Sequence, residues 1–599
     1  IRKTYTILSI TQMGVVGVNG ESTLNYQGQG VWSGLLNMAN VVTDVNKNFN
    51  FRINSDNAYA IKRVKGTTNT VKMESQAAAS NIPVEEINGL QDKGNYTVTL
   101  DMNHYVYSAV DSLKITVMGS SVPSGTGATN NQGYIYLYTQ QLKQRYAQSK
   151  EANWNVVNMS IGGNSTRDVM GRVDRDLYPQ FGRYVIFALS LGNEGIHGST
   201  NQQGVFDQWK NNMLSLIDAA RAKGLVPIVT NNYTRGDFDL SDYGYVKKMD
   251  LLIHEWDVPS VNLLGAIDDG AGRWAAGYQN GTDVSHPNDA GHAELSYAMV
   301  PSLYNALRAG KPVPVKATGN YMTFDNTASM DQLVYTPDNI VHPFTVSFDI
   351  KTTANGTIAS FKQGSAYGYL KIDAATGAIV YQSPNTGAAQ IKGTVAVNDG
   401  QWHKITLTHF YARGETDLYS DNTLAGKLTE KLVPTVFNLN DSNGPATISC
   451  RDLFFYRAGM NADEVAGLNA GKMLKSSLEL YAPLNGQAAT TAGQLINLAQ
   501  STTTLAKVQL PTTGIKVPTQ FSTVKVYPNP AQSRLTIEGF NQAKQYECAV
   551  YGIDGRMAFK QMIHNGDALN VSALPTSHYV LVLKDKSSIE QVILSFTKN

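Results

Sequence analysis

The stretch ITVMGSSVPSGTGA, Ile115 to Ala128, begins as an apolar strand and ends abruptly in a run of Gly and Ser. A buried strand that ends in small residues is a common place for a loop to carry function, because the sheet fixes where the loop's side chains point. Ser and Gly also favour ordinary turns for conformational reasons. The neighbouring segments decide between a plain turn and a functional loop.

Apolar runs and helix-like segments alternate around this stretch. The runs SLKITVM, WNVVNMSI, RYVIFALSL and GLVPIVTN alternate with segments such as GYIYLYTQQLKQRYAQ and WKNNMLSLIDAARAKG. Strands that alternate with helices indicate a parallel sheet covered by helices. We therefore expect an α/β domain over residues 113–312.

The segments on either side show a β pattern instead. Short β-type runs separated by Asn, Gly and Asp predict a β-sandwich over residues 1–112, and a second all-β unit is expected over 318–485. Residues 486–520, rich in Ala, Thr and Gln, are typical of a linker, and a final β module is expected over 521–599. The chain is thus predicted to be multidomain, with a central α/β/α domain flanked by β-sandwiches.

Composition narrows the possible partners. The 599 residues carry a formal net charge of +1 with 16% charged residues, so no broad basic surface for nucleic acid is expected. Abundant Gly, Asn, Thr, Ser and Tyr are typical of extracellular β-rich proteins. Cys450 and Cys548 fall in different predicted domains, so no disulfide is expected.

The first residues leave two interpretations open. The segment TYTILSITQMGVVGV, Thr4 to Val18, resembles a signal peptide in part, but Gln12 and the alternation of Val with Gly favour a first strand. No run of 18 apolar residues occurs elsewhere, so we expect no membrane span.

Three predicted strands end in residues suited to hydrolysis of an ester. Such hydrolysis needs a nucleophile, a base and donors for the oxyanion formed during attack. Ser121 follows the first strand, Gly163 follows the second, and Asn193 follows a later one. The carboxyl ends of parallel strands meet at one edge of an open sheet, where ligands bind. We expect these residues to converge there.

A candidate base lies further along the chain, in GTDVSHPNDAGHAEL, where Asp283 precedes His286 by three residues. Asn288 or Asp289 is suited to cap the helix that follows, which would hold the loop still. Asp283 could then orient His286, as the carboxylate does in a Ser-His-Asp triad. A lone His is more often structural, so the order and placement of all these residues carry the interpretation.

These blocks, and DVSHPNDAGH above all, resemble the SGNH/GDSL hydrolases, over residues 113–312. The resemblance implies a flavodoxin-like α/β/α fold and a role for each block. Ser121 would be the nucleophile, His286 the base and Asp283 its partner, while Gly163, Asn193 and the Ser121 N–H would donate to the oxyanion. Two positions depart from the family pattern: Ser120 stands where Asp is usual, and Glu194 follows Asn193 where Asp is usual.

Three flanking segments have resemblances of their own. Residues 1–112 vaguely resemble immunoglobulin-like or carbohydrate-binding sandwiches, in which Trp32 would stack on sugar or pack in the core. VNDGQWHKITLTHF, Val397 to Phe410, resembles laminin-G-like and concanavalin A-like sandwiches. VKVYPNPAQSRLTI, AVYGIDGRM and LNVSALPTSHYVLVL resemble the C-terminal sorting domain of the type IX secretion system of Bacteroidetes.

Together these features predict a secreted or surface-displayed serine esterase that acts on O-acylated carbohydrate, most simply by removing acetyl groups. The type IX secretion machinery is the implied partner, and no cofactor or metal site is expected. Two other functions stay open. One is a glycan-binding surface adhesin whose hydrolase domain is inactive, favoured by Ser120, and the other is a lipase or thioesterase with a preference for long acyl chains.

Overall fold

A parallel sheet positions the residues of interest in the computed structural model of the chain. It consists of β9 (Val106–Gly119), β10 (Asn155–Asn158), β11 (Gly182–Ala188), β12 (Val226–Thr230) and β13 (Ser260–Val261), in the spatial order β10-β9-β11-β12-β13. All four neighbouring pairs are parallel. The strands therefore present their carboxyl ends along one edge, as the alternating pattern predicts.

The structure describes residues 9–38, 48–67, 69–87, 95–230, 233–326, 330–385, 389–441, 444–445, 447–486, 489–490, 493–510, 523–585 and 591–599. The chain divides into a larger unit of residues 1–323, 333–439 and 448–507 and a smaller unit of residues 324–332, 440–447 and 508–599. Residues 1–8, part of the segment with the signal-peptide-like features, lie outside the described residues.

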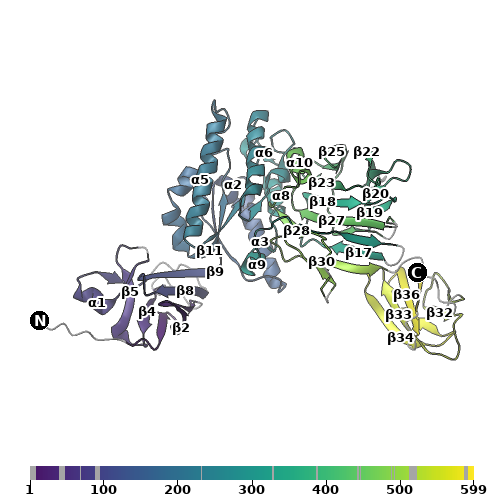
Figure 1. Ribbon diagram of the computed structural model, residues 1–599, viewed down its shortest axis with the longest axis horizontal. Helices are drawn as coiled ribbons and strands as arrows, with labels where there is room; N and C mark the ends of the chain where they lie inside the picture. Colours follow the sequence, from purple (N-terminus) through teal and green to yellow (C-terminus); the bar gives the residue numbers. More distant parts are fainter. Residues whose placement is uncertain are drawn as a thin grey trace. The chain divides into compact units, whose positions relative to one another are not determined.

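Helices cover both faces of the parallel sheet (Figure 1). Tyr134, Tyr138 and Tyr304 pack against one face, and Trp209, Met213 and Met249 pack against the other. The elements are α2 (Ser121–Ser124), η3 (Thr129–Asn131), α3 (Tyr134–Ala147), α4 (Thr166–Met170), η4 (Val173–Leu177), η5 (Tyr178–Gln180), α5 (Gln202–Ala222), α6 (Leu240–Glu255), α7 (Leu264–Ile267), β14 (Gln279–Asn280), β15 (Asp283–Pro287), α8 (Asp289–Tyr297) and α9 (Leu303–Arg308).

The N-terminal residues form antiparallel strands around a core of their own. The elements are β1 (Met13–Gly17), β2 (Gly20–Gly28), β3 (Val31–Asn37), β4 (Asn50–Ile53), η2 (Asn57–Tyr59), β5 (Ala60–Val64), β6 (Val71–Met73), α1 (Glu74–Ala79), β7 (Val84–Glu85) and β8 (Asn95–Asp101). Trp32 packs partly against this core and lies 4.9 Å, centroid to centroid, from the exposed ring of Tyr26.

The boundary predicted at residue 112 falls inside strand β9. Its first half pairs antiparallel with β8, and its second half pairs parallel with β10 and β11. One continuous strand thus joins the antiparallel N-terminal strands and the parallel strands in a single sheet. The strand continues past residue 112 because β8 pairs with it up to Asp111 and β11 pairs with it from Asp111 onward.

Residues that follow the α/β domain form two further sheets. One has the order β16 (Met322–Asp325), β27 (Thr447–Tyr456), β18 (Phe344–Lys351), β23 (His403–Phe410), β24 (Glu415–Ser420) and β25 (Thr423–Thr429), with β28 (Leu478–Ala482) on β27. The other has the order β22 (Gln390–Ala396), β21 (Ala378–Gln382), β20 (Ala366–Ile372), β19 (Gly356–Gln363), β26 (Val436–Leu439), β17 (Met330–Tyr335), β30 (Leu505–Leu510) and β29 (Gln494–Leu495). Aromatic pairs such as Phe348 with Phe437 join the sheets, and α10 (Ala462–Asn469) completes what we call the two-sheet domain.

Part of the predicted linker over 486–520 belongs to this domain instead. Strands β29 and β30 pair with each other, and Ala499 and Leu505 are fully buried. Ala- and Thr-rich sequence lacks the periodicity that signals a strand, so these two strands, QL and LAKVQL, were not predicted. Residues 487–488, 491–492 and 511–520 of the predicted linker lie outside the described residues.

The C-terminal residues form two small sheets around a core that includes Leu535, Val550 and Leu581. One sheet has the order β31 (Lys525–Tyr527), β32 (Arg534–Glu538) and β35 (Ala568–Asn570). The other has the order β34 (Met557–Ile563), β33 (Tyr546–Gly552), β36 (Ser577–Asp585) and β37 (Gln591–Lys598).

Cys450 and Cys548 are buried free thiols, and burial raises the pKa of each.

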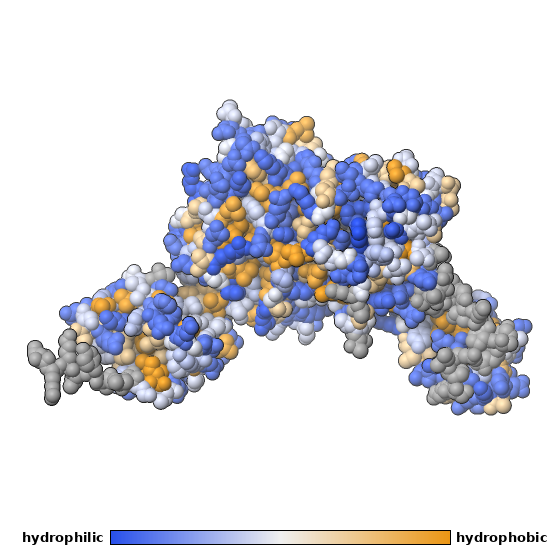
Figure 2. Space-filling view, in the orientation of Figure 1, coloured by the Kyte–Doolittle hydropathy of each residue, from blue (hydrophilic) through white to orange (hydrophobic). Residues whose placement is uncertain are grey.

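The face shown in Figure 2 is largely hydrophilic and carries several separate hydrophobic patches. Among the described residues, no helix is both long enough and apolar enough to cross a membrane.

Candidate active site

Ser121 is the first residue of the short helix α2, and only Ser120 separates it from the end of β9. The turn requires Gly119, because a Cβ there would lie 2.5 Å from Pro123 and 2.8 Å from the Ala188 carbonyl oxygen. Gly125, which ends the helix, has a φ of 98°, in the left-handed region that favours glycine. The opening stretch is therefore a strand, a tight bend and one turn of helix that presents Ser121 at the edge of the sheet.

The structure brings Ser121, His286 and Asp283 together. His286 Nε2 lies 2.8 Å from Ser121 Oγ, and His286 Nδ1 lies 2.7 Å from Asp283 Oδ2. The second oxygen of Asp283 accepts a hydrogen bond of 2.9 Å from the Ser285 N–H. Residues separated by more than 160 positions in the chain thus form one connected hydrogen-bond chain.

The charge of Asp283 decides which ring nitrogen of His286 carries the proton. Burial raises the pKa of Asp283, but hydrogen bonds from His286 and the Ser285 N–H, with help from the nearby Arg235 charge, outweigh it and leave the pKa below its usual value. An ionised carboxylate only accepts hydrogen bonds. Nδ1 therefore donates to Asp283, and Nε2 is free to accept the Ser121 proton.

His286 lies in the short strand β15 and not in a loop as predicted, and several contacts hold this strand. The Val284 carbonyl accepts hydrogen bonds from the Gly236 N–H at 2.7 Å and from Trp274 Nε1 at 3.0 Å. After β15, Asn288 caps helix α8 by accepting a hydrogen bond from the Gly291 N–H, which settles the choice between Asn288 and Asp289. Asp289 instead accepts two hydrogen bonds of 2.7 Å from Thr129.

Gly163 and Asn193 face the same cavity as Ser121 and His286. Gly163 has a φ of 80°, and a Cβ on it would meet nothing within 4 Å, so backbone conformation and not crowding requires glycine here. Asn193 Nδ2 donates a hydrogen bond of 3.1 Å to the Asn164 carbonyl. An amide nitrogen has two protons, so the second remains for a ligand in the cavity.

The two departures from the family pattern have structural explanations. Glu194 accepts hydrogen bonds from the Thr166 N–H at 2.5 Å and the Thr166 hydroxyl at 3.1 Å, and so ties the Asn193 loop to the start of α4. Burial raises the pKa of Glu194. Ser120 is fully buried near Tyr233, and its hydroxyl has no hydrogen-bond partner among the described residues.

The cavity has a volume of about 360 Å³, and most of its lining residues carry polar side chains, although their apolar atoms also contribute to its wall. The lining residues are Ser121, Val122, Thr126, Gly162, Gly163, Ser190, Asn193, Tyr233, Arg235, Ser285 and His286. Sequence reasoning missed Arg235, which pairs with Asp237 at 2.9 Å and donates to Ser285 Oγ at 2.8 Å. The sequence did contain a signal for Arg235. Tyr233 and Arg235 follow the strand GLVPIVTN, and residues after the carboxyl ends of parallel strands lie where ligands bind.

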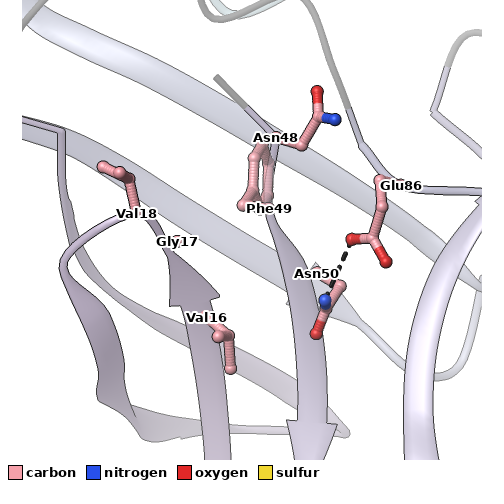
Figure 3. Close-up of a pocket in the computed structure, with 7 residues that line it drawn as sticks. All are labelled: Val16, Gly17, Val18, Asn48, Phe49, Asn50 and Glu86. Carbon is pink, nitrogen blue, oxygen red and sulfur yellow. Dashed lines mark hydrogen bonds between the residues drawn. The ribbon is translucent and has the colours of Figure 1, made fainter. Parts of the chain in front are cut away.

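A second cavity of about 250 Å³ lies in the N-terminal domain (Figure 3). Val16, Gly17, Val18, Asn48, Phe49, Asn50 and Glu86 line it, and Asn50 Nδ2 donates a hydrogen bond of 2.9 Å to Glu86. None of these lining residues offers a hydroxyl, thiol or imidazole, so the cavity lacks a nucleophile and base of the kind found beside Ser121.

Asp250, His254 and Glu464 form a buried group whose ligand atoms lie within 4.8 Å of one another. His254 Nδ1 accepts hydrogen bonds of 3.0 Å from the backbone N–H groups of Lys475 and Ser476. The ring proton is then on Nε2, which donates to Glu464 at 3.2 Å. A metal would need that nitrogen's lone pair, so the group is better described as a hydrogen-bond network.

Two segments of the chain match known families. Residues 117–294 match the GDSL-like lipase/acylhydrolase family, and residues 525–595 match the secretion system C-terminal sorting domain. The chain therefore contains a GDSL-like domain, which supports an ester-hydrolysing enzyme, and a sorting domain, which indicates type IX secretion to the cell surface or the extracellular space. The predicted laminin-G-like identity of residues 318–485 stays a prediction.

Several solved structures are similar to parts of the chain. A catalytic mutant of an acetylxylan esterase from Geobacillus stearothermophilus is 19% identical over 31% of this chain and 91% of its own, with a TM-score of 0.26. A putative lipolytic protein of the G-D-S-L family from Desulfitobacterium hafniense is 12% identical over 31% and 95%, with a TM-score of 0.26. A heptameric SAP-like pentraxin from Limulus polyphemus is 13% identical over 24% and 76%, with a TM-score of 0.20. No curated protein matches the chain.

Proposed function

We propose that this protein is a serine esterase that removes short O-acyl groups, most simply acetyl, from carbohydrate outside the cell. The observation that carries the proposal is the hydrogen-bond chain from Ser121 Oγ through His286 to Asp283, at 2.8 and 2.7 Å. Nucleophile, base and orienting carboxylate within such distances are the arrangement that activates a serine hydroxyl.

In the proposed reaction, His286 Nε2 takes the Ser121 proton as Oγ attacks the ester carbonyl. The carbonyl oxygen becomes an oxyanion, and Gly163, Asn193 and the Ser121 N–H donate hydrogen bonds to it. The C–O bond to the sugar breaks, and the sugar oxygen takes the proton from His286. Water, deprotonated by His286, then attacks the acyl-serine, which releases the carboxylic acid and restores the Ser121 hydroxyl.

The cavity supports a short acyl group on a polar alcohol. Hydroxyls from Ser190 and Ser285 and the guanidinium of Arg235 share the lining with Asn193. Val122 and Tyr233 are the larger apolar contributors, whereas a long acyl chain needs an extended apolar wall. Polar groups that converge on a site fix the orientation of a hydroxylated ligand better than that of a hydrocarbon.

The test is hydrolysis of p-nitrophenyl acetate, butyrate and octanoate by the full chain, followed by acetate release from acetylated xylan and other acetylated polysaccharides. We expect the acetate ester to be preferred and Ser121→Ala to lower kcat by about 10⁴-fold or more. Preference for octanoate would favour a lipase or thioesterase. No turnover of any ester, with glycan binding retained, would favour the adhesin.

A further inference from the structure

Arg172 is a buried cation behind the active-site cavity. Only 5% of the residue is exposed, and it lies between α4 and η4, outside the cavity lining. Asp176 balances its charge at 3.1 Å from Nη1. A buried guanidinium is costly to desolvate unless its donors are used, so its partners indicate its role.

The guanidinium joins the ends of two strands of the parallel sheet. Nη1 donates a hydrogen bond of 2.8 Å to the Met159 carbonyl, which follows β10, and Nη2 donates one of 3.3 Å to the carbonyl of Gly119, which ends β9. Gly119 lies two residues before Ser121. Arg172 therefore holds the sheet edge from which the nucleophile loop departs.

A third contact leads to the proposed oxyanion site. Arg172 Nε donates a hydrogen bond of 2.7 Å to Asn164 Oδ1, and the carbonyl of the same Asn164 accepts the hydrogen bond from Asn193 Nδ2. Asn164 directly follows Gly163. The guanidinium is thus linked through one residue to both proposed oxyanion donors that lie outside the nucleophile loop.

We propose that Arg172 is a positioning residue that sets the oxyanion site through Asn164. This inference rests on the proposed function. An amide group is planar, so fixing one N–H of Asn193 on the Asn164 carbonyl also fixes the direction of the other N–H. Donors that are already aimed at the oxyanion need no reorganisation during the reaction, which is where their catalytic effect arises. The rigid guanidinium fork reaches all three acceptors at once.

The first test compares Arg172→Met with Arg175→Met on p-nitrophenyl acetate. Arg175 lies three residues away, its side chain is 71% exposed, and its guanidinium donates its hydrogen bonds to Asp176 and not to Asn164. We expect R172M to lower kcat by about 10- to 100-fold, less than the loss of a whole oxyanion donor, with little change in KM. R175M should keep the wild-type kcat. A wild-type kcat in R172M, or an equal loss in R175M, would overturn the proposal.

The second test uses Asn164→Ala, which removes the side-chain acceptor of Arg172 but keeps the carbonyl that holds Asn193. N164A should lower kcat as R172M does, and the double variant should be about as slow as the slower single one, because both remove the same link. Costs that multiply would mean that Arg172 does not act through Asn164. Should R172M fail to fold, N164A alone tests the proposal, since Arg172 keeps its other contacts in that variant. A wild-type kcat in N164A would refute the positioning role of Arg172.

The two proposals can fail separately. A wild-type protein that hydrolyses no ester would refute the proposed function. Crystal structures of the wild type and N164A would then still test the inference, because the Asn193 amide should rotate away from the cavity in the variant. An unchanged Asn193 amide would overturn the positioning role, whatever the activity.

Discussion

Ser120 stands where the resembled pattern has Asp, and the bend that contains it still brings Ser121 within 2.8 Å of His286 Nε2. It is fully buried beside Tyr233, and Gly119 and Ser121 on either side keep the positions that the tight bend requires. A small hydroxyl fits there without a charge that burial would penalise. The hydroxyl of its neighbour Ser121, by contrast, is hydrogen-bonded to His286 Nε2.

We therefore expect Ser120→Ala to retain most of the esterase activity, with a fall in kcat below about tenfold, while Ser121→Ala loses at least about 10⁴-fold. The measurement is kcat on p-nitrophenyl acetate for both variants, with melting temperatures as the control for folding. If S120A proves as inactive as S121A, the nucleophile has been assigned to the wrong hydroxyl.

Strand β9 shows how far the sequence predicts the elements. The change from alternating to continuous burial near residue 113 was visible as the change from YSAVDS to LKITVMG, so the two environments could be predicted. The sequence could not predict that one strand runs through both environments, because the continuity of a strand depends on its partners from distant segments. The same limit hid β29 and β30, whose short sequences carry no period.

The candidate site was more predictable than its support. Ser121, Gly163 and Asn193 each follow a predicted strand, and the carboxyl ends of parallel strands meet at one edge of the sheet. His286 was predicted instead from its spacing to Asp283 and from the helix start that follows it. Arg172 lies two residues past a helix and gave no comparable local signal, because its role depends on carbonyl groups contributed by other strands. Local patterns predict which elements form, whereas long-range polar contacts depend on how they pack.

Helices α6 and α10 meet at the buried network of Asp250, His254 and Glu464. Burial and the negative charge of Glu464 raise the pKa of Asp250 well above its usual value. Above pH of about 4 the unfolded chain ionises Asp250 while the folded chain keeps it protonated. The folded state then binds the proton more tightly, so this group makes the protein less stable as pH rises toward the raised pKa.

Asp250→Asn should remove this pH dependence, because an amide stays neutral and still donates to Glu464. We expect the melting temperature of D250N, relative to wild type, to increase from about pH 5 to pH 8. Asp257→Asn is the matched control, since that side chain is 83% exposed near the end of the same helix. A difference between D250N and wild type that stays constant across pH would contradict the assignment.

At the scale of the larger unit, the α/β domain and the two-sheet domain share buried polar contacts. Arg413 pairs at 2.7 Å with Asp268, which is 2% exposed, and Asn262 Nδ2 donates to Glu464 at 2.6 Å. Arg145 of α3 also pairs with Asp338. Removing one partner from such a buried pair typically costs about 3–5 kcal/mol, because the other charge stays buried alone. The two domains therefore stabilise each other.

A chain truncated after Gly310 should consequently lose both stability and activity, whereas one truncated after Leu510 should keep them. The shorter chain exposes the apolar surface under the two-sheet domain and leaves Asp268 and Asp250 without their partners from it. Calorimetry of the longer chain should show the two domains unfolding in one transition, since contacts of about this strength couple them. The kcat values of the two truncated chains on p-nitrophenyl acetate give the second measurement. A shorter chain with the melting temperature and kcat of the longer one would show that the α/β domain folds and works alone, and that the contacts with the two-sheet domain only tether it.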